Sequence, residues 1–230
     1  MVAAIIVAAG KGTRMKDLLR KQYLSLAGLP ILTRTLLVFE DCALINQIVL
    51  VIPPDNMDFC KNNIISPANI TKKILLVSGG ERRQDSVYNG LKKVDPSCAL
   101  VVIHDGVRPF VQNDQLIACI SGARKFGACL LGVPAYDTLK QTDASSRIIQ
   151  TLPRDNVWLA QTPQAFRYDL IKKAHEKARS EGYTGTDDAS LVERLGVAVT
   201  IIEGSRSNLK ITSRADLKIA RGLLDCSLSD

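Results

Sequence analysis

Short apolar runs alternate with amphipathic stretches along most of this chain. The runs are rich in Ile, Val and Leu and end at polar or turn residues, which is typical of strands buried on both faces of a parallel sheet. They predict strands at 3–8, 47–52, 73–77, 99–103, 128–133 and 197–202. The stretches between them predict helices at 31–39, 83–92 and 115–125. This alternation predicts an α/β fold with one doubly wound, mostly parallel, Rossmann-like sheet.

Residues 134–153 interrupt the alternation. Two short strand-like segments, 136–142 and 147–152, flank the turn sequence Asp143-Ala144-Ser145-Ser146, so a β-hairpin is expected. A lone hairpin has no core of its own, which favours an arm that packs against a second subunit in a homodimer. An edge hairpin folded onto its own domain is the alternative. We therefore predict a single domain over 1–230 with a protruding β-hairpin arm at about 134–156.

The composition is that of an ordinary globular protein. Of the 230 residues, 46% are hydrophobic and 23% are charged, and the length permits one or two domains. No apolar stretch approaches about 18 residues, and the N-terminus lacks the basic segment and apolar core of a signal peptide. These observations predict a cytoplasmic protein with no membrane partner.

Cysteine spacing and net charge exclude some functional classes. The six cysteines form no C-x-x-C pair and do not cluster with the two histidines, which argues against zinc and favours reduced, buried thiols. The net charge of +7 is compatible with nucleic acid or with small anionic substrates. Because the chain has no RNA-binding or zinc-finger signature and only 5% aromatic residues, we predict small anionic substrates and no nucleic-acid partner.

The first predicted strand leads directly into the loop Gly10-Lys11-Gly12-Thr13-Arg14. Its two glycines allow the backbone to approach a ligand closely, and Lys11 and Arg14 bring positive charge to the same place, which favours a nucleoside triphosphate. Met15 stands where a dinucleotide fingerprint needs glycine, and the order of glycine and lysine does not match a Walker A loop. A loop that serves only chain geometry is the alternative.

Polar segments follow most of the predicted strands. Open α/β sheets bind ligands at the carboxyl ends of their strands, so we expect these segments to meet at one edge of the sheet. In chain order they are Lys21-Gln22-Tyr23, 79–87, 104–110, Asp137-Thr138, Arg154, 161–164 and 207–212.

Asp105 follows the strand at 99–103 and is the predicted metal ligand. Mg²⁺ takes one or two carboxylates together with phosphate oxygens, which suits a carboxylate that faces a triphosphate. The alternative is a carboxylate that caps the following turn. Strand alternation points the preceding His104 to the opposite face, where we expect a hydrogen-bonded core histidine. His175 belongs to the charged helical segment KKAHEKAR and is predicted to face solvent.

No nucleophile with a base partner stands out, because Ser86 and Thr138 have no histidine nearby in the sequence. A phosphate monoester is already largely ionised at neutral pH, since its second pKa is about 6, and it can attack without a general base. The site must then supply charge neutralisation and alignment around the α-phosphate of the nucleotide. The side chains available for this are Lys11, Arg14, Lys21, Arg154 and Lys210. The alternative for each of them is a solvated surface charge.

Taken together, these segments resemble those of the 2-C-methyl-D-erythritol 4-phosphate cytidylyltransferases of isoprenoid biosynthesis, over nearly the whole chain. The resemblance rests on AAGKGTRM, KQY, GGERRQDSV, HDGVRPF, DT at 137–138, QTPQAF, TDDASLVERLG and NLKIT. The first motif is shared by many nucleotidyltransferases, whereas the full set in this order is specific. The resemblance implies a sheet of nucleotidyltransferase type with Mg²⁺ as cofactor. It also implies transfer of CMP from CTP to 2-C-methyl-D-erythritol 4-phosphate, releasing pyrophosphate.

The resemblance also implies roles for residues at matching positions. Arg14 and Lys21 match the pair that stabilises the pentacoordinate α-phosphate, and Asp105 matches the metal-binding aspartate. Thr138, Arg154 and Thr162 match contacts to the acceptor, some of them reached from the partner subunit through the arm. The residues assigned to CTP are Ala8, Ala9, Gly10, Lys11, Gly12, Gly80, Glu81, Ser86 and Lys210.

Two departures from the family pattern and two alternatives stay open. Arg20 stands where family members often have proline, and it is a rival for the role of Lys21; Glu81 stands where aspartate is frequent. A ribitol-5-phosphate cytidylyltransferase is the first alternative, although such relatives usually open with Ala-Gly-Gly where this chain has Ala8-Ala9-Gly10. A non-catalytic nucleotide-binding protein is the second. Such a protein would be expected to lose Arg14, Lys21 or Asp105, yet this chain has all three.

Overall fold

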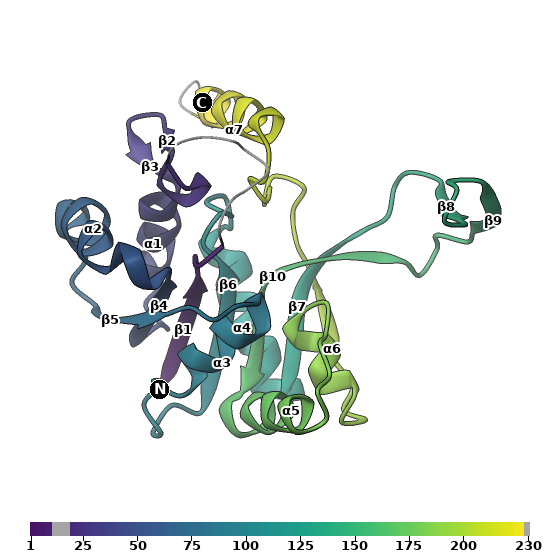
Figure 1. Cartoon of the computed structure of the whole chain (residues 1–230), viewed down its shortest axis with the longest axis horizontal. Helices are drawn as coiled ribbons and strands as arrows, with labels where there is room; N and C mark the ends of the chain where they lie inside the picture. Colours follow the sequence, from purple (N-terminus) through teal and green to yellow (C-terminus); the bar gives the residue numbers. More distant parts are fainter. Residues whose placement is uncertain (11–18, 228–230) are drawn as a thin grey trace.

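In the described part of the chain, a seven-stranded sheet forms the centre of the molecule, with helices on both of its faces (Figure 1). The structure is a computed structural model, and it describes residues 1–10 and 19–227. β10 runs antiparallel to both of its neighbours, and every other pair in this described sheet is parallel. From one edge to the other the strands are β11 (Thr200–Glu203), β7 (Ala128–Pro134), β10 (Trp158–Arg167), β6 (Leu100–Asp105), β1 (Val2–Val7), β4 (Gln47–Ile52) and β5 (Lys73–Ser78).

Both faces of the sheet carry apolar side chains, as β1 illustrates. Val2, Ala4 and Ile6 belong to one apolar cluster, whereas Ala3 and Ile5 belong to another on the opposite face. All of these side chains are almost inaccessible to solvent. A strand covered on both faces therefore needs the unbroken apolar run that the sequence shows.

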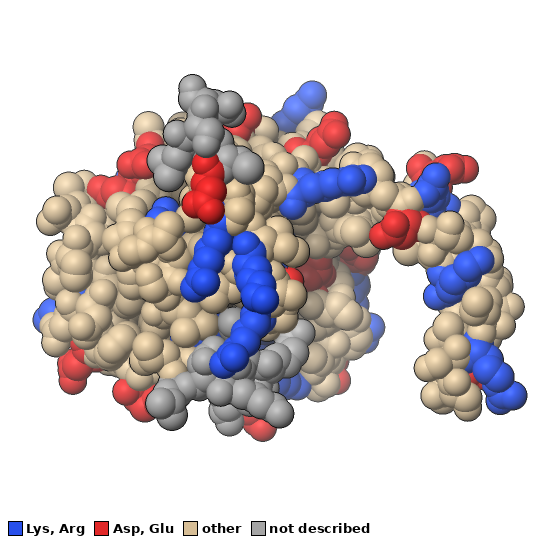
Figure 2. Space-filling view, turned by 90° about the horizontal axis from the view of Figure 1, so that it is seen from above, with Lys and Arg blue, Asp and Glu red and all other residues tan. Residues whose placement is uncertain are grey.

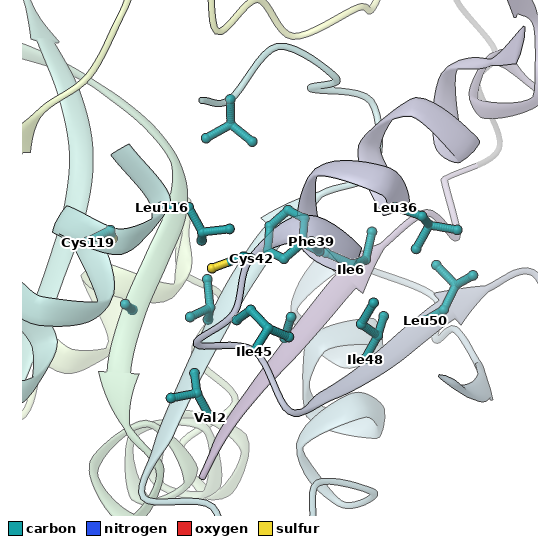
Figure 3. Packing of buried hydrophobic residues seen from close by; sticks show 14 of the residues in the cluster. Val2, Ile6, Leu36, Phe39, Cys42, Ile45, Ile48, Leu50, Leu116 and Cys119 are labelled. Carbon is teal, nitrogen blue, oxygen red and sulfur yellow. The ribbon is translucent and has the colours of Figure 1, made fainter. Parts of the chain in front are cut away.

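Helices cover the two clusters. The first cluster lies under α1 (Ile31–Asp41) and α4 (Asn113–Phe126), with Phe39 of α1 packed among its side chains (Figure 3). The second lies under α3 (Arg83–Leu91), α5 (Tyr168–Ser180) and α6 (Asp188–Glu193). A third, smaller cluster joins α7 (Arg214–Ser227) to the short pair β2 (Ser25–Leu26) and β3 (Leu29–Pro30). The short helices are η2 (Lys21–Tyr23), η3 (Pro54–Asn56), α2 (Met57–Cys60), η4 (Lys61–Ile65) and η5 (Ser66–Ala68).

None of the described helices combines the length and the apolar character needed to cross a membrane. The strands and helices that the apolar pattern predicts are all present, and β4 begins and ends with its apolar run. The mostly parallel α/β fold is therefore confirmed.

β10 is the element that the sequence pattern does not predict. It inserts between β6 and β7 in the middle of the sheet, although Gln161, Thr162 and Gln164 are polar and Pro163 has no N–H to donate. A register shift in its pairing with β7, between Ala160 and Gln164, accommodates the proline. Central strands with an internal proline are rare, which is why 161–164 reads as a connecting segment in the sequence.

The predicted hairpin is present and projects away from the body of the molecule (Figures 1 and 2). β8 (Leu139–Thr142) and β9 (Ile148–Leu152) pair with each other, and within the described residues they join no other strand. Ile148 is 63% exposed and Ile149 is 61% exposed. The hairpin is therefore not folded onto the edge of its own sheet. We call the segment 136–157, which includes both strands and their connections to β7 and β10, the arm.

Candidate active site

A cavity of about 220 Å³ lies at the carboxyl ends of β1, β5 and β6. We call it the first cavity. The residues assigned from the sequence that line it are Ala8, Ala9, Gly10, Lys21, Gly80, Glu81, Ser86, Asp105 and Lys210. Of the segments that the strand-end rule predicts to meet, the first cavity therefore brings together KQY, 79–87, 104–110 and 207–212. Lys11, Gly12 and Arg14 lie outside the described residues.

Two loops approach each other closely at this cavity. A Cβ atom at Gly79 would lie 2.2 Å from the Cβ atom of Ala9, so the loop after β5 can reach the loop after β1 only with glycine there. The Gly80 amide donates to Ser86 Oγ at 3.0 Å, and the Ser86 hydroxyl can donate to the Arg82 carbonyl at 3.1 Å. Ser86 therefore holds the loop in shape at the start of α3.

Gln22 explains how Lys21 is placed at the cavity. Its side chain is buried, and its Nε2 donates to the Ala8 carbonyl at 2.7 Å, which ties the KQY segment to the end of β1. Arg20, the rival for the role of Lys21, forms an ion pair with Asp55 at 2.6 Å and does not line the first cavity. The geometry thus favours Lys21 over Arg20.

Asp105 ends β6 and lies among basic side chains. Its Oδ2 is 2.7 Å from Lys210 Nζ and 3.8 Å from Arg108 Nε, and its Oδ1 accepts a hydrogen bond from Arg83 Nε at 3.1 Å. Burial alone would raise the pKa of this carboxyl, but Arg83, Lys210 and Arg108 outweigh burial and hold the pKa below its ordinary value. Asp105 is therefore an ionised carboxylate at neutral pH, although it is buried.

A second cavity, of about 260 Å³, shares Arg83, Asp105 and Lys210 with the first. Thr162 of β10 lines it, and Thr162 Oγ1 accepts a hydrogen bond from the Asp105 amide at 3.1 Å. The other residues around this second cavity are Arg108, Ala160, Gln161, Gln164, Thr186 and Asp187. β10 therefore brings Thr162 to Asp105, as expected for a residue that contacts the acceptor.

Thr138 and Arg154 lie on the arm and line neither cavity. Both are exposed, and Arg154 donates a hydrogen bond to the carbonyl of Tyr136. One copy of the chain, as far as its described residues go, does not bring these two side chains to Asp105. Their assignment to the acceptor stays a prediction and requires an arm from a second subunit.

His104 has the structural role that strand alternation predicts. It is buried, and its Nε2 lies 3.0 Å from the Arg108 carbonyl. Burial lowers the pKa of His104 to about 4, so its ring is neutral at physiological pH.

The prediction that His175 faces solvent is wrong. Its side chain is fully buried, and Nε2 lies 3.1 Å from Asp188 Oδ1. Although charged residues dominate KKAHEKAR, Ile171, Ala174 and Ala178 form with His175 one buried stripe of α5 at helical spacing. That spacing is a signal from which the burial could have been found.

Several site residues receive no role from the sequence: Gln22, Arg83, Arg108, Asp188 and Asn208. Arg83 and Arg108 stand in the motifs GGERRQDSV and HDGVRPF, but the local sequence does not say which charge turns inward. Asn208 connects its own segment to β10 and to Arg108. Its Nδ2 donates to the Thr162 carbonyl at 2.8 Å, and its backbone carbonyl accepts from Arg108 Nη1 at 2.6 Å.

Asp105 suits a divalent cation by its chemistry. Mg²⁺ binds through one or two carboxylates together with phosphate oxygens, and the first cavity offers Asp105 with Glu81 among the same lining residues. Among residues 1–10 and 19–227, no group of three or more His, Cys, Asp or Glu side chains could hold a metal by itself. The donors therefore fit an ion that arrives with a triphosphate.

The arrangement can neutralise and align phosphate groups. Lys21, Arg83 and Lys210 line the first cavity, and the N-terminus of α3 lies at the same wall, where its backbone N–H groups favour an anion. The hydroxyl of Ser86 is engaged in its own loop. Among the described lining residues, no hydroxyl or thiol is paired with a general base, so the described site offers no activated nucleophile.

Comparison with known sequences gives matches over almost the whole chain. The family model for IspD, 2-C-methyl-D-erythritol 4-phosphate cytidylyltransferase, matches residues 2–225. A 2-C-methyl-D-erythritol 4-phosphate cytidylyltransferase from Syntrophus aciditrophicus is 48% identical over 223 residues, covering 97% of this chain and 95% of the relative. A bifunctional enzyme IspD/IspF from Desulforudis audaxviator is 48% identical over 221 residues, covering 96% of this chain. The match covers 56% of that relative, so the chain spans about half the length of the bifunctional protein.

A solved structure shares the fold. The crystal structure of 4-diphosphocytidyl-2C-methyl-D-erythritol synthase from Anaerococcus prevotii superposes with a TM-score of 0.87 at 35% sequence identity. The match covers 97% of this chain and 96% of the crystallised chain. The similarity therefore includes the sheet, its covering helices and the strand ends that form the two cavities.

Proposed function

The chain belongs to the 2-C-methyl-D-erythritol 4-phosphate cytidylyltransferase family, and from this premise we propose how it transfers the cytidylyl group of CTP to 2-C-methyl-D-erythritol 4-phosphate. The reaction releases pyrophosphate and makes the protein a nucleotidyltransferase. One observation carries the assignment of the site: the described residues predicted for CTP and for catalysis line one cavity at the carboxyl edge of the sheet.

In the proposed reaction, the phosphate of the acceptor attacks the α-phosphate of CTP directly. A new P–O bond forms to the acceptor as the bond to the departing pyrophosphate breaks, in line with it. The acceptor phosphate needs no base, because it is largely ionised at neutral pH. Lys21 neutralises the charge that builds up on the α-phosphate, together with Arg14, which lies outside the described residues.

The remaining assignments come from the family resemblance, and the positions of the described residues support them. The loops Ala8-Ala9-Gly10 and Gly80-Glu81, with Ser86, hold the cytidine part of CTP, and Lys210 faces the triphosphate. Lys11 and Gly12, which lie outside the described residues, are also assigned to CTP. Thr162 holds the acceptor from the second cavity, next to Asp105.

We also propose Mg²⁺ as the cofactor, with Asp105 as its protein ligand. The ion would supply further neutralisation of the triphosphate and of the departing pyrophosphate. Arg83 and Lys210 keep the Asp105 carboxylate ionised, which is the form that a cation needs.

We propose that the chain works as a homodimer joined by its arm. The exposed Ile148 and Ile149 support this, because apolar residues on a hairpin without a core gain from burial against a second chain. Thr138 and Arg154 would then reach the acceptor in the partner's site. A single domain over 1–230, with the arm predicted at about 134–156, and a cytoplasmic location stay predictions from the sequence.

The test of the activity offers the purified protein CTP with either acceptor and measures the release of pyrophosphate. We expect turnover with 2-C-methyl-D-erythritol 4-phosphate and little with ribitol 5-phosphate; the family match does not favour the ribitol enzyme or a non-catalytic binding protein. A preference for ribitol 5-phosphate would overturn the proposed acceptor. Rapid quenching during turnover should trap no nucleotide covalently bound to the protein, and a trapped adduct would contradict direct attack.

A further inference from the structure

The segment TDDAS at 186–190 is a motif that the proposed reaction does not use. Its two aspartates have different positions. Asp187 caps the N-terminus of α6 by accepting from the Ser190 amide at 2.9 Å, whereas Asp188 turns inward and is almost completely buried. A buried carboxylate is costly unless charged or hydrogen-bonding partners compensate for its lost hydration. The partners of Asp188 therefore show what its burial achieves.

Both oxygens of Asp188 are engaged. Oδ2 accepts from Arg83 Nη1 at 2.7 Å, and Oδ1 lies 3.1 Å from His175 Nε2. His175 is fully buried on α5 and stacks on the ring of Tyr88, with 6.3 Å between the ring centroids. Asp188 thus connects α5 and α6 to an arginine of α3. It lines neither cavity itself.

Two glutamines fix the segment that carries Asp188. Gln84 of α3 donates to the Tyr183 carbonyl at 3.1 Å and accepts from the Gly185 amide at 3.0 Å. Gln164 of β10 donates to Asp187 Oδ2 at 2.8 Å and accepts from the Ala189 amide at 3.0 Å. The backbone on both sides of Asp188 is therefore anchored to elements that also form the site.

Arg83 passes this anchoring on to Asp105. Its guanidinium is held at Nη1 by Asp188, and its Nε donates to Asp105 Oδ1 at 3.1 Å. Because the guanidinium is planar and rigid, fixing Nη1 also fixes the direction of Nε. The second oxygen of Asp105 faces Lys210 at the edge of the cavities. Arg83 therefore holds one oxygen of Asp105, and the other oxygen pairs with Lys210, which lines both cavities.

We propose that the ion-pair chain His175–Asp188–Arg83 positions the Asp105 carboxylate for the metal–nucleotide complex, and that this is the role of Asp188 in TDDAS. Asp188 and His175 are positioning residues, because neither lines the cavities. The inference rests on the proposed function, in which Asp105 acts at the triphosphate. Groups that orient a metal ligand commonly change affinity or activity by roughly 10- to 100-fold when they are removed.

The test uses the isosteric variant Asp188→Asn in the full-length protein. Its amide cannot compensate the charge of Arg83, so we expect kcat to fall roughly 10- to 100-fold, with KM for the acceptor changed much less. Binding of Mn²⁺ in the presence of CTP and without acceptor, measured by calorimetry, should weaken by roughly the same factor. His175→Gln keeps a hydrogen-bond donor and should retain most of the turnover, whereas His175→Leu should lose more.

Leu191→Ala is the matched control, because Leu191 is buried in the same helix and its side chain is apolar. It should lower the melting temperature without lowering kcat at a temperature well below melting. If Asp188→Asn does not fold, His175→Leu, which removes the other partner of Asp188 and lines neither cavity, carries the same expectation. Normal kcat and normal Mn²⁺ binding in the folded variant would overturn the positioning role. Full activity of Asp105→Asn would instead overturn the proposed role of Asp105, so the two failures are distinguishable.

Discussion

The cavity around Asp105 and the arm differ in whether their side chains find partners within the same chain. At the cavity, Asp105 and Arg83 are charged, and both engage partners from the same chain. On the arm, Ile148 and Ile149 are apolar, yet they are exposed on a hairpin that joins no other strand of the described chain. The described residues assigned to the nucleotide, and Thr162 of those assigned to the acceptor, are therefore brought together within one chain, whereas Thr138 and Arg154 lie apart from them on the arm. Four changes test this difference.

The largest effect is expected at the cavity. Lys21→Ala should lower turnover by about 10²-fold or more, because a donor that acts on the transition state is lost, and CTP binding should weaken less. Arg14→Ala should behave in the same way. Steady-state pyrophosphate release and calorimetric CTP binding measure the two quantities. Lys218→Ala, an exposed lysine on α7, is the control and should leave turnover unchanged; near-normal turnover of Lys21→Ala would refute its role.

The second change addresses the arm. Ile149→Asp places a carboxylate where we expect apolar burial, at a cost of about 2 kcal/mol or more, which raises the dimer Kd about 30-fold. Light scattering after size exclusion should show monomers at low micromolar concentration, with the melting temperature of the body preserved. Turnover should fall with the dimer, while CTP binding remains. An unchanged dimer would exclude Ile149 from the interface.

The third change separates the two substrates. Arg154→Ala removes a charge-assisted hydrogen bond, so KM for the acceptor should rise about tenfold while KM for CTP stays the same. Arg147→Ala is the matched control on the arm, because Arg147 is exposed and pairs with Asp143 in the hairpin turn. An equal rise in both KM values would contradict a role confined to the acceptor.

Mixing the first and third variants tells whether the arm acts across the subunit boundary. If Arg154 serves the partner's site, a heterodimer of Lys21→Ala and Arg154→Ala contains one site with both groups intact. With the acceptor well below its KM, where both variants are impaired, activity should then recover when the two proteins are mixed and exchanged. If Arg154 serves its own chain, every site keeps one defect and mixing restores nothing.

The smallest effect is expected in the hairpin turn. Asp143 accepts from the backbone amides of Ser145 and Arg147 at 2.9 Å each. Asp143→Ala should destabilise the turn by about 1 kcal/mol and raise the dimer Kd about fivefold. At protein concentrations well above the dimer Kd, kcat should not change. A large loss of kcat would mean that the turn, rather than the apolar strands beside it, governs the arm.

The sheet could be predicted because strands that are buried on both faces have unbroken apolar runs in their sequence. β1 and β4 are examples, and their boundaries follow from local sequence. β10 has no such apolar run, since polar residues and Pro163 occupy its middle. Its pairing with β6 and β7 depends on residues that are far away in the sequence. Local patterns therefore predict the parallel strands and miss the strand that completes the site.

The site itself was predictable as a set of segments but not as a network. Asp105 follows its strand directly, so the strand-end rule finds it. The pair of Arg83 and Asp188 joins positions 105 residues apart, and nothing in either local sequence indicates the partner. The burial of His175 follows the apolar spacing of α5, whereas its partner Asp188 is not indicated by that spacing. Thr138 and Arg154 illustrate a further limit, because the described part of one chain does not bring them to the other residues.

The path of the chain through β7 and β10 connects the arm to the site. Both strands lead from the sheet to the arm (Figure 1), and β10 pairs with β7 over 158–160 and 164–166, on either side of the register shift. β10 thus carries both one end of the arm and Thr162, whose hydroxyl accepts a hydrogen bond from the Asp105 amide. Changes in the length of the hairpin alter how far the arm reaches, whereas changes in β7 or β10 alter the point from which the arm projects.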